Sequence, residues 1–93
     1  MYVVIGEATI DATRREESLT QVNDVLIPLL SNATGFVNGY WLRNADGSKG
    51  MSVLIFDTEA NAVAASHMRP PDPLEDPPVH GVTLNVYEVV ATA

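Results

Sequence analysis

Apolar residues dominate the first ten positions in a pattern that favours an extended chain. Residues 2–10, YVVIGEATI, are rich in β-branched and aromatic side chains, which predicts a strand. Side chains alternate across a strand, so this segment has two registers. One register holds Val3, Ile5, Glu7 and Thr9, and the other holds Tyr2, Val4, Gly6, Ala8 and Ile10.

Helical spacing replaces this alternation from about Thr13 or Ser18 to Asn32. The apolar positions of this segment are Leu19, Val22, Val25, Leu26, Leu29 and Leu30. They share one side of an amphipathic helix, with polar residues on the other side. Pro28 removes one backbone donor inside the helix and is predicted to bend its last turn. The helix is expected to end between Asn32 and Gly35, residue types that are common at helix ends.

Residues 35–43, GFVNGYWLR, are apolar on both sides of a predicted second strand. One side carries Phe36, Asn38, Tyr40 and Leu42, and the other carries Val37, Gly39, Trp41 and Arg43. The pair Asp46-Gly47 tolerates the positive φ angles of a tight hairpin. A third strand is predicted at residues 50–57, GMSVLIFD, paired antiparallel with the second. Strands with two apolar faces need cover on both sides.

A second helix is predicted at residues 58–68, TEANAVAASHM, with Asp57 or Thr58 as its N-cap. Its apolar stripe is expected to contain Ala60, Val63, Ala64 and His67. Residues 69–79 contain five prolines, which lack a backbone donor and fix φ, so an irregular loop is predicted there. This loop is expected to act as a lid, as an arm that embraces a partner, or as a plain surface excursion. A fourth strand is predicted at residues 82–90, VTLNVYEVV.

The predicted order is strand, helix, strand, strand, helix, strand. Two β-α-β units joined by a hairpin form a ferredoxin-like α+β fold, with a four-stranded antiparallel sheet and both helices on one face. The side chains assigned to the helix-facing side are Val3, Ile5, Met51, Val53, Ile55, Val82, Leu84 and Val86. Those assigned to the opposite side are Tyr2, Val4, Ile10, Leu54, Phe56, Tyr87 and Val89.

Large apolar side chains therefore remain on the sheet face that no helix covers. Burying about seven of them contributes on the order of 10 to 20 kcal/mol. A contiguous patch of this size is rare on a soluble monomer. We therefore expect a homodimer in which two copies pack sheet against sheet about a two-fold axis. Exchanging the two registers leaves this expectation unchanged, because both registers are apolar.

Composition limits the classes of partner. The chain has 93 residues, 46% hydrophobic and 18% charged, as expected of one globular domain over residues 1–93. A formal charge of −7 and five scattered basic residues argue against nucleic acid or an anionic membrane as a partner. The absence of cysteine excludes disulfides and thiolate ligands. Without a signal peptide or a long apolar run, a cytoplasmic location is expected.

Two passages of the chain resemble those of a known group. LIPLLSNATGF at residues 26–36, continued by the second strand, and VLIFDTEANAVAA at residues 53–65 are similar to passages of the dimeric α/β-barrel superfamily. Within that superfamily the chain resembles the antibiotic biosynthesis monooxygenase family, and the order of elements extends the likeness over nearly the whole chain. The resemblance implies a homodimeric barrel and a cofactor-independent monooxygenase or related enzyme acting on a small apolar or aromatic molecule.

The haem-degrading members of that group differ from this chain where their chemistry lies. They carry an asparagine at the position that matches Glu7. They also carry a tryptophan and a histidine where this chain has Asn61 or nearby alanines and the proline-rich loop. His67 lies closer to the helix end, and Trp41 belongs to another element. No haem, and no other cofactor, is therefore expected.

Glu7 and His67 are the candidate catalytic residues. Glu7 interrupts an apolar register that is predicted to face the helices, where desolvation would raise the pKa of its carboxyl and suit it to act as a base. His67 belongs to the predicted apolar stripe of the second helix, where its imidazole would act as an acid or base. The alternatives are a carboxylate paired near the strand end and a structural histidine. Two histidines without matched carboxylates predict no metal site.

Trp41, Tyr40, Tyr87 and Asn38 are the candidate ligand-pocket residues. Aromatic walls with polar tips suit an aromatic ligand, and they suit a dimer core equally well. Asn38 lies in a register expected to face away from the helices, where its amide needs a partner. Two functions remain open: an enzyme acting on an apolar molecule without a metal, and a non-catalytic ligand-binding or oligomerisation module.

Overall fold

The computed structural model describes residues 1–70 and 74–93. The strands are β1 (Tyr2–Ile10), β2 (Phe36–Arg43), β3 (Lys49–Phe56) and β4 (Val79–Glu88). The helical segments are η1 (Ala12–Arg14), α1 (Arg15–Gln21), η2 (Val22–Leu26), α2 (Ile27–Ser31) and α3 (Glu59–Ser66). Each predicted strand and helix is present, although β4 begins earlier than its pattern indicated.

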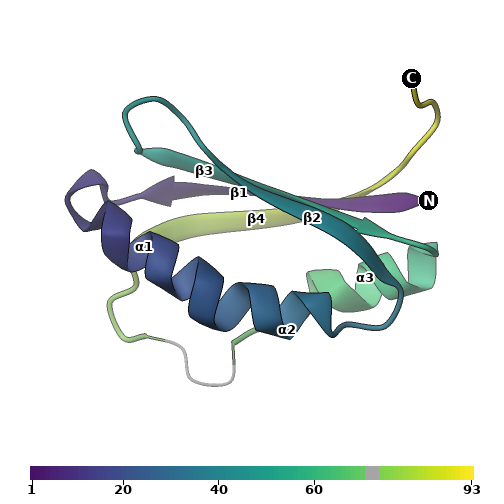
Figure 1. Cartoon of the computed structure of the whole chain (residues 1–93), viewed down its shortest axis with the longest axis horizontal. Coiled ribbons are helices and arrows are strands. Elements are labelled where there is room, and N and C mark those ends of the chain that lie inside the picture. Colours follow the sequence, from purple (N-terminus) through teal and green to yellow (C-terminus); the bar gives the residue numbers. More distant parts are fainter. Residues whose placement is uncertain (71–73) are drawn as a thin grey trace.

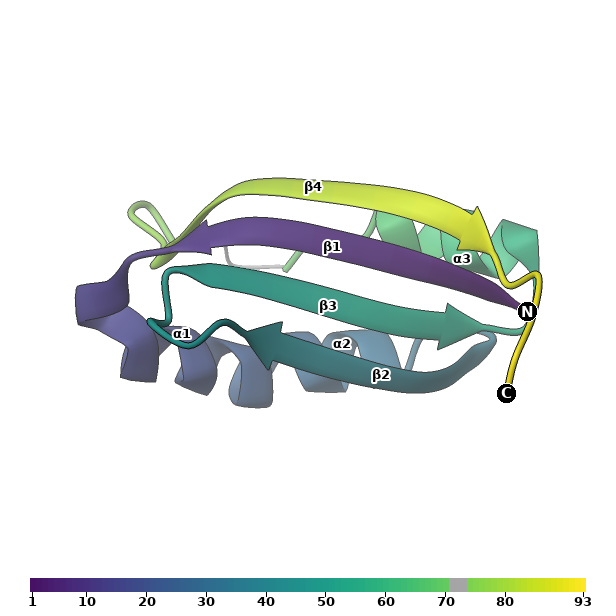
Figure 2. The ribbon, with the colours of Figure 1, turned by 90° about the horizontal axis from the view of Figure 1, so that it is seen from above.

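The four strands form one antiparallel sheet in the order β2-β3-β1-β4. All helical segments lie on one face of this sheet, as Figure 1 shows in side view. Figure 2 shows the opposite face, which none of the helices and strands of the described residues covers. This arrangement confirms the ferredoxin-like α+β prediction. No helix among the described residues is long and apolar enough to cross a membrane.

The long helical rod that crosses the sheet contains a wide turn in its middle. It begins at Asp11, whose side chain accepts hydrogen bonds from the Thr13 amide at 3.0 Å and hydroxyl at 2.7 Å. At η2 the hydrogen-bonding pattern is that of a π-helix, and the Ile27 amide donates to the Val22 carbonyl. Pro28 follows at once and has no amide hydrogen. The irregularity therefore precedes Pro28 instead of following it in the last turn as predicted.

The register predicted for β1 and β3 is wrong. The core contains Val4, Leu54, Phe56, Ala62 and Ala65, so the even-numbered residues of both strands face the helices. Leu84 and Val86 of β4 pack against this core as predicted. Both registers are apolar, so hydrophobicity did not separate them. The odd register also contains the charged residues Glu7 and Lys49, and turning it outward avoids burying them.

A shift of register on β2 brings its first residue to the core. The pairing of β2 with β3 shifts between Phe36 and Asn38, so Val37 is an extra residue. Phe36 therefore meets Phe56 edge to face, with ring centroids 5.8 Å apart. After the shift, Trp41 faces the helices, while Tyr40 faces the open side of the sheet.

The apolar stripe of α3 also differs from the prediction. Ala62 and Ala65 are its buried residues, and the predicted stripe of Ala60, Val63, Ala64 and His67 is exposed. The helix begins at Thr58, whose hydroxyl accepts from the Asn61 amide at 3.2 Å, which confirms one of the two predicted caps. Because alanine dominates the helix, its sequence contains little contrast from which to choose a face.

Candidate functional site

A cavity separates the long helical rod from the sheet. It has two adjoining lobes of about 320 and 420 Å³, a size typical of small-molecule sites. The residues that border both lobes are Ser18, Val22, Leu26, Trp41, Ser52, Val79, Val82 and Leu84. The first lobe extends toward the β2–β3 hairpin and the second toward α3. Most of this lining is aliphatic, so the cavity suits an apolar molecule.

Small residues on the sheet side leave this space open. Gly6, Ala8, Gly50 and Ser52 border the first lobe from β1 and β3, where larger side chains would otherwise fill the gap below the helix. At Gly6 of β1, the side chains of Ser52 on β3 and Leu84 on β4 lie close to the backbone. A Cβ there would collide with Ser52 Oγ and lie 2.9 Å from Leu84 Cδ2. The sheet therefore provides a floor without large side chains.

The wide helical turn forms the opposite wall. Val22 and Leu26, the two ends of η2, border both lobes, and Ser18 lies one turn earlier and is buried. π-type turns recur at functional sites because they change the direction of neighbouring side chains. Here the turn directs two aliphatic side chains at the cavity.

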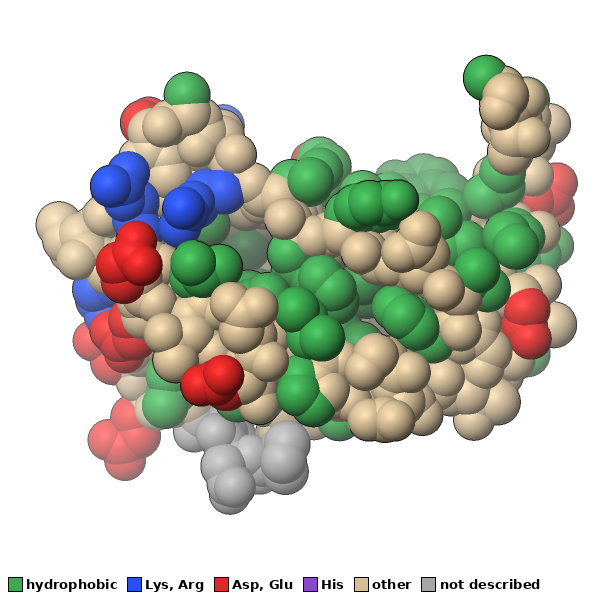
Figure 3. Space-filling model, in the orientation of Figure 1, with side chains coloured by type: hydrophobic (Ala, Val, Ile, Leu, Met, Phe, Trp, Pro, Cys, Tyr) green, Lys and Arg blue, Asp and Glu red, His purple; other side chains and the backbone are tan. Residues whose placement is uncertain are grey.

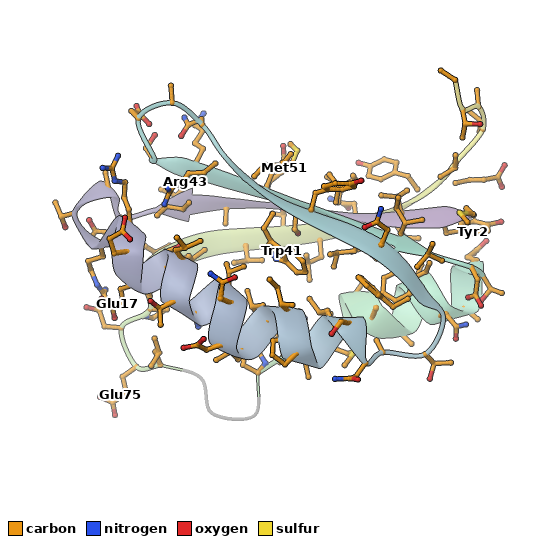
Figure 4. The ribbon with its side chains drawn as sticks, in the orientation of Figure 1. Tyr2, Glu17, Trp41, Arg43, Met51 and Glu75 are labelled. Carbon is orange, nitrogen blue, oxygen red and sulfur yellow. The ribbon has the colours of Figure 1, made fainter. Side chains whose placement is uncertain are left out.

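Trp41 lies at the junction of the two lobes. It is half-buried, lies opposite Ser52 in the β2–β3 pairing, and borders both lobes. In Figure 4 its side chain projects from β2 into the space above the helical rod. An indole with a free face beside an apolar cavity can stack on a ring of a ligand. Its role in ligand binding remains a prediction.

The other three predicted pocket residues border neither lobe. Tyr40 and Tyr87 are 53% and 55% exposed on the uncovered sheet face. Asn38 shares that face, as predicted, and its Nδ2 donates to the Tyr40 hydroxyl at 3.1 Å. The two tyrosines share the aromatic character of Trp41, but they lie in the register that faces the uncovered side of the sheet. Val22, Leu26 and Ser52 line the cavity instead, and their small or aliphatic side chains gave no functional signal.

The predicted surroundings of Glu7 are wrong. Glu7 pairs with Met51 and Thr83 in the outward register of β1, and it is exposed. It borders the first lobe from the strand, but it lacks the desolvation expected of a carboxylate beneath the helices. The reversed register of β1 is the physical reason.

The predicted surroundings of His67 are also wrong. It is the C-cap residue of α3, is exposed, and borders neither lobe. The structure therefore does not bring Glu7 and His67 together in one cavity. Their catalytic roles stay predictions without the geometry that motivated them. Within residues 1–70 and 74–93, no cluster of three or more potential metal ligands occurs.

The shifted ionisable groups among the described residues stabilise local structure away from the cavity. Hydrogen bonds from Thr13 lower the pKa of Asp11, and a hydrogen bond from Arg14 lowers the pKa of Glu17. A hydrogen bond to Glu88 raises the pKa of the Tyr2 phenol. None of these titrating side chains borders either lobe.

The described residues of the proline-rich loop border one side of the second lobe. Pro70, Leu74 and Pro77 border this lobe. Arg14 Nη2 donates to the Asp76 carbonyl at 2.8 Å, which fastens the loop to the start of the helical rod. The described part of the loop thus lies against the helical rod, and its role as a lid, an arm or a plain surface excursion stays a prediction. Residues 71–73 lie outside the described residues.

Solved structures of other proteins share this architecture. The haem degrader MhuD of Mycobacterium tuberculosis, solved with two haems in its active site, is similar over 100% of this chain and 99% of its own, with 20% identity and a TM-score of 0.74. A protein of Deinococcus radiodurans provisionally named an antibiotic biosynthesis monooxygenase is similar over 100% of this chain and 96% of its own, with 11% identity and a TM-score of 0.78. SnoaB, a cofactor-independent oxygenase of Streptomyces nogalater, is similar over 98% of this chain and 94% of its own, with 9% identity and a TM-score of 0.64.

This chain has the antibiotic biosynthesis monooxygenase-like fold. The resemblance seen in the sequence is thereby confirmed at the level of fold, over the full chain. At these identities the likeness does not extend to chemistry. No protein-family model and no curated protein sequence matches the chain.

Proposed function

We propose that residues 1–93 form one domain that binds a small apolar, ring-containing molecule beside Trp41 and oxidises it with O₂ without a cofactor. The observation that carries this proposal is the apolar two-lobed cavity between the sheet and the helical rod. Its volume suits a fused-ring molecule, and the indole of Trp41 offers a flat surface for stacking. The common fold with SnoaB, a cofactor-independent oxygenase, supports the type of reaction.

Such a reaction needs a substrate that supplies the electrons itself. An activated CH₂ group on an electron-rich ring, as in an anthrone, meets this need. Its carbon is oxidised to a carbonyl by four electrons, which matches the four-electron reduction of O₂. Both C–H bonds break and the O–O bond breaks, one oxygen atom forms the C=O bond of the product, and the other leaves as water with the two hydrogens. The protein's contribution is to hold the ring in one orientation and to exclude bulk water. The aliphatic side chains of Val22 and Leu26 serve the second purpose.

Oxygen uptake with a simple anthrone tests this function. The purified protein, mixed with 1,8-dihydroxyanthrone in aerated buffer, should consume O₂ faster than buffer alone. The product should gain one oxygen and lose two hydrogens by mass spectrometry. Heat-unfolded protein provides the blank. Uptake equal to that blank, together with unchanged Trp41 fluorescence, would overturn the proposal.

The second function, non-catalytic binding of a small ligand, is favoured by a different observation. Glu7 is exposed in the outward register of β1, and His67 borders neither lobe. The two residues predicted to act as acid and base therefore do not meet in the cavity, and general acid–base catalysis needs such groups within hydrogen-bond reach of the substrate. Quenching of Trp41 by the anthrone without oxygen uptake would favour this second function.

A homodimer is part of the proposal. The uncovered sheet face exposes Tyr40, Leu42, Met51 and Tyr87, which are 38 to 55% accessible. The other sheet face is already occupied by helices, so a second copy packed face to face would cover these side chains. The cytoplasmic location expected from the sequence stays a prediction that cell fractionation can check.

A further inference from the structure

Three basic side chains gather at the hairpin end of the cavity, although the protein carries a formal charge of −7. Arg15 packs over the hairpin, where a Cβ on Gly47 would lie 3.4 Å from its Nη1. Arg43 ends β2, and Lys49 begins β3. Figure 3 shows this basic group at one end of the molecule, over the hairpin and the start of α1. Acidic side chains lie beside it, so the group is a local exception to the overall charge.

Arg43 connects this basic group to the cavity. It lies two residues from Trp41 on the same side of β2, opposite Gly50, and it borders the first lobe. Its guanidinium is exposed and makes no salt bridge within residues 1–70 and 74–93. Arg14, by contrast, forms two salt bridges: its Nη2 lies 2.7 Å from Glu17 Oε1, and its Nη1 lies 3.5 Å from Asp76 Oδ2. A guanidinium at the rim of an apolar cavity, without a salt-bridge partner among the residues that the structure describes, is available to a ligand.

Nearby carboxylates do not neutralise Arg43 directly. Asp46 Oδ1 accepts hydrogen bonds from the Ser48 amide and hydroxyl within the hairpin. Glu7 borders the same lobe, but its register directs it to the uncovered sheet face. The five donors of an arginine suit a planar carboxylate, which they bind through two parallel hydrogen bonds.

We propose that the ligand of this cavity has an apolar body and one anionic group, a carboxylate, which Arg43 binds at the rim of the first lobe. Arg15 and Lys49 add a positive field that attracts the anion to a protein whose net charge would otherwise repel it. This inference rests on the proposed function, because Arg43 would bind the carboxylate of the same molecule whose apolar body lies beside Trp41. The substrate class is therefore an apolar carboxylic acid.

Two related fluorescent probes separate this inference from the binding of any apolar molecule. 8-Anilinonaphthalene-1-sulfonate is anionic, and N-phenyl-1-naphthylamine has the same ring system without the charge. Trp41 is the only tryptophan, so energy transfer from it reports a probe bound nearby. The anionic probe should bind the native protein more tightly, and its affinity should fall as salt is added. 1-Naphthoic acid, a carboxylate, should displace it more effectively than naphthalene.

Arg43→Gln should lower the affinity for the anionic probe about tenfold, as expected for the loss of one charge-assisted pair. It should change the affinity for the neutral probe less than about twofold. Lys49→Gln is the matched control, because it removes the same charge from a residue that does not border the cavity. Lys49→Gln should lower the affinity for the anionic probe less than about threefold. Arg43→Lys keeps the charge and should restore part of the affinity. Near-ultraviolet circular dichroism confirms the fold of each variant.

Each contrary outcome has a distinct meaning. Equal affinity for both probes, unchanged by Arg43→Gln, would overturn the carboxylate inference and leave the cavity proposal intact. Energy transfer that persists when Ser52→Phe fills the space beside Trp41 would show that the probe binds elsewhere and would count against the inference. Absence of energy transfer to either probe would overturn the proposed function as well.

Discussion

Trp41 of β2 lies directly opposite Ser52 of β3, and both side chains border both lobes of the cavity. The indole and the small hydroxymethyl group share the helix-facing side of the sheet. Because serine occupies so little volume, the face of the indole beside it remains open to a ligand. The size of residue 52 is therefore expected to control access to Trp41.

Ser52→Phe should fill the space next to the indole. We expect the affinity for N-phenyl-1-naphthylamine to fall at least about tenfold, while the protein stays folded because the cavity accepts the added ring. Titration followed by Trp41 energy transfer measures this. Ser52→Ala, which preserves the space, should bind within about twofold of the native protein. Equal binding by the phenylalanine variant would show that the ligand lies elsewhere.

A charge on the uncovered sheet face should separate the proposed dimer. Tyr40→Glu places a carboxylate within the apolar patch, where a partner would have to desolvate it. Light scattering at micromolar concentration should give a monomer mass for this variant and twice that mass for the native protein. Val63→Glu, on the outer side of α3, is the control and should remain dimeric. A native protein of monomer mass would refute the dimer.

The turn before β2 depends on glycine. Gly35 has φ of +80°, its carbonyl accepts from the Asp57 amide at 3.0 Å, and a Cβ there would collide with the Asp57 and Asn61 side chains. Gly35→Ala should lower the free energy of unfolding by about 2 to 3 kcal/mol in urea titrations, from backbone strain plus steric collision.

Gly81→Ala is the matched control for this turn. Gly81 also has a positive φ, of +62°, but a Cβ there meets nothing within 4 Å. Only the backbone cost of about 1 kcal/mol is expected. Equal losses in the two variants would show that the Asp57 and Asn61 contacts add nothing at Gly35.

Stability should fall in acid partly through the cap of the first helix. Hydrogen bonds from Thr13 hold the pKa of Asp11 below its ordinary value of 3.8 in the folded state. The ionised cap is therefore stabilising above about pH 4, and this contribution is lost as the pH falls through the folded pKa.

Unfolding in urea at several pH values tests this cap. Asp11→Ala should be less stable than the native protein at neutral pH, and the difference should shrink below about pH 4. Asp24→Ala is the control, because the Asp24 side chain makes no hydrogen bond within the described residues. A constant difference between Asp11→Ala and native protein across this range would contradict the assignment.

Element order was predictable because each signal was local. The Asp46-Gly47 turn, the Thr58 cap and the apolar periodicity each act over a few residues, and together they indicate one topology. The register of β1 and β3 was not predictable from hydrophobicity, since both alternatives are apolar. The charged Glu7 is the one residue of the register Val3, Ile5, Glu7 and Thr9 that favours an outward face, because burying an unpaired carboxylate is costly.

The sequence by itself determined the ferredoxin-like fold and the presence of an apolar sheet face without helices. Only the tertiary structure decided which side of each strand is buried, and hence that Trp41 borders a cavity while Tyr40 and Tyr87 do not. The physical reason is that a cavity is a property of what several elements leave empty. Its floor at Gly6 and Ser52 and its wall at Val22 come from distant parts of the chain, and only packing brings them together.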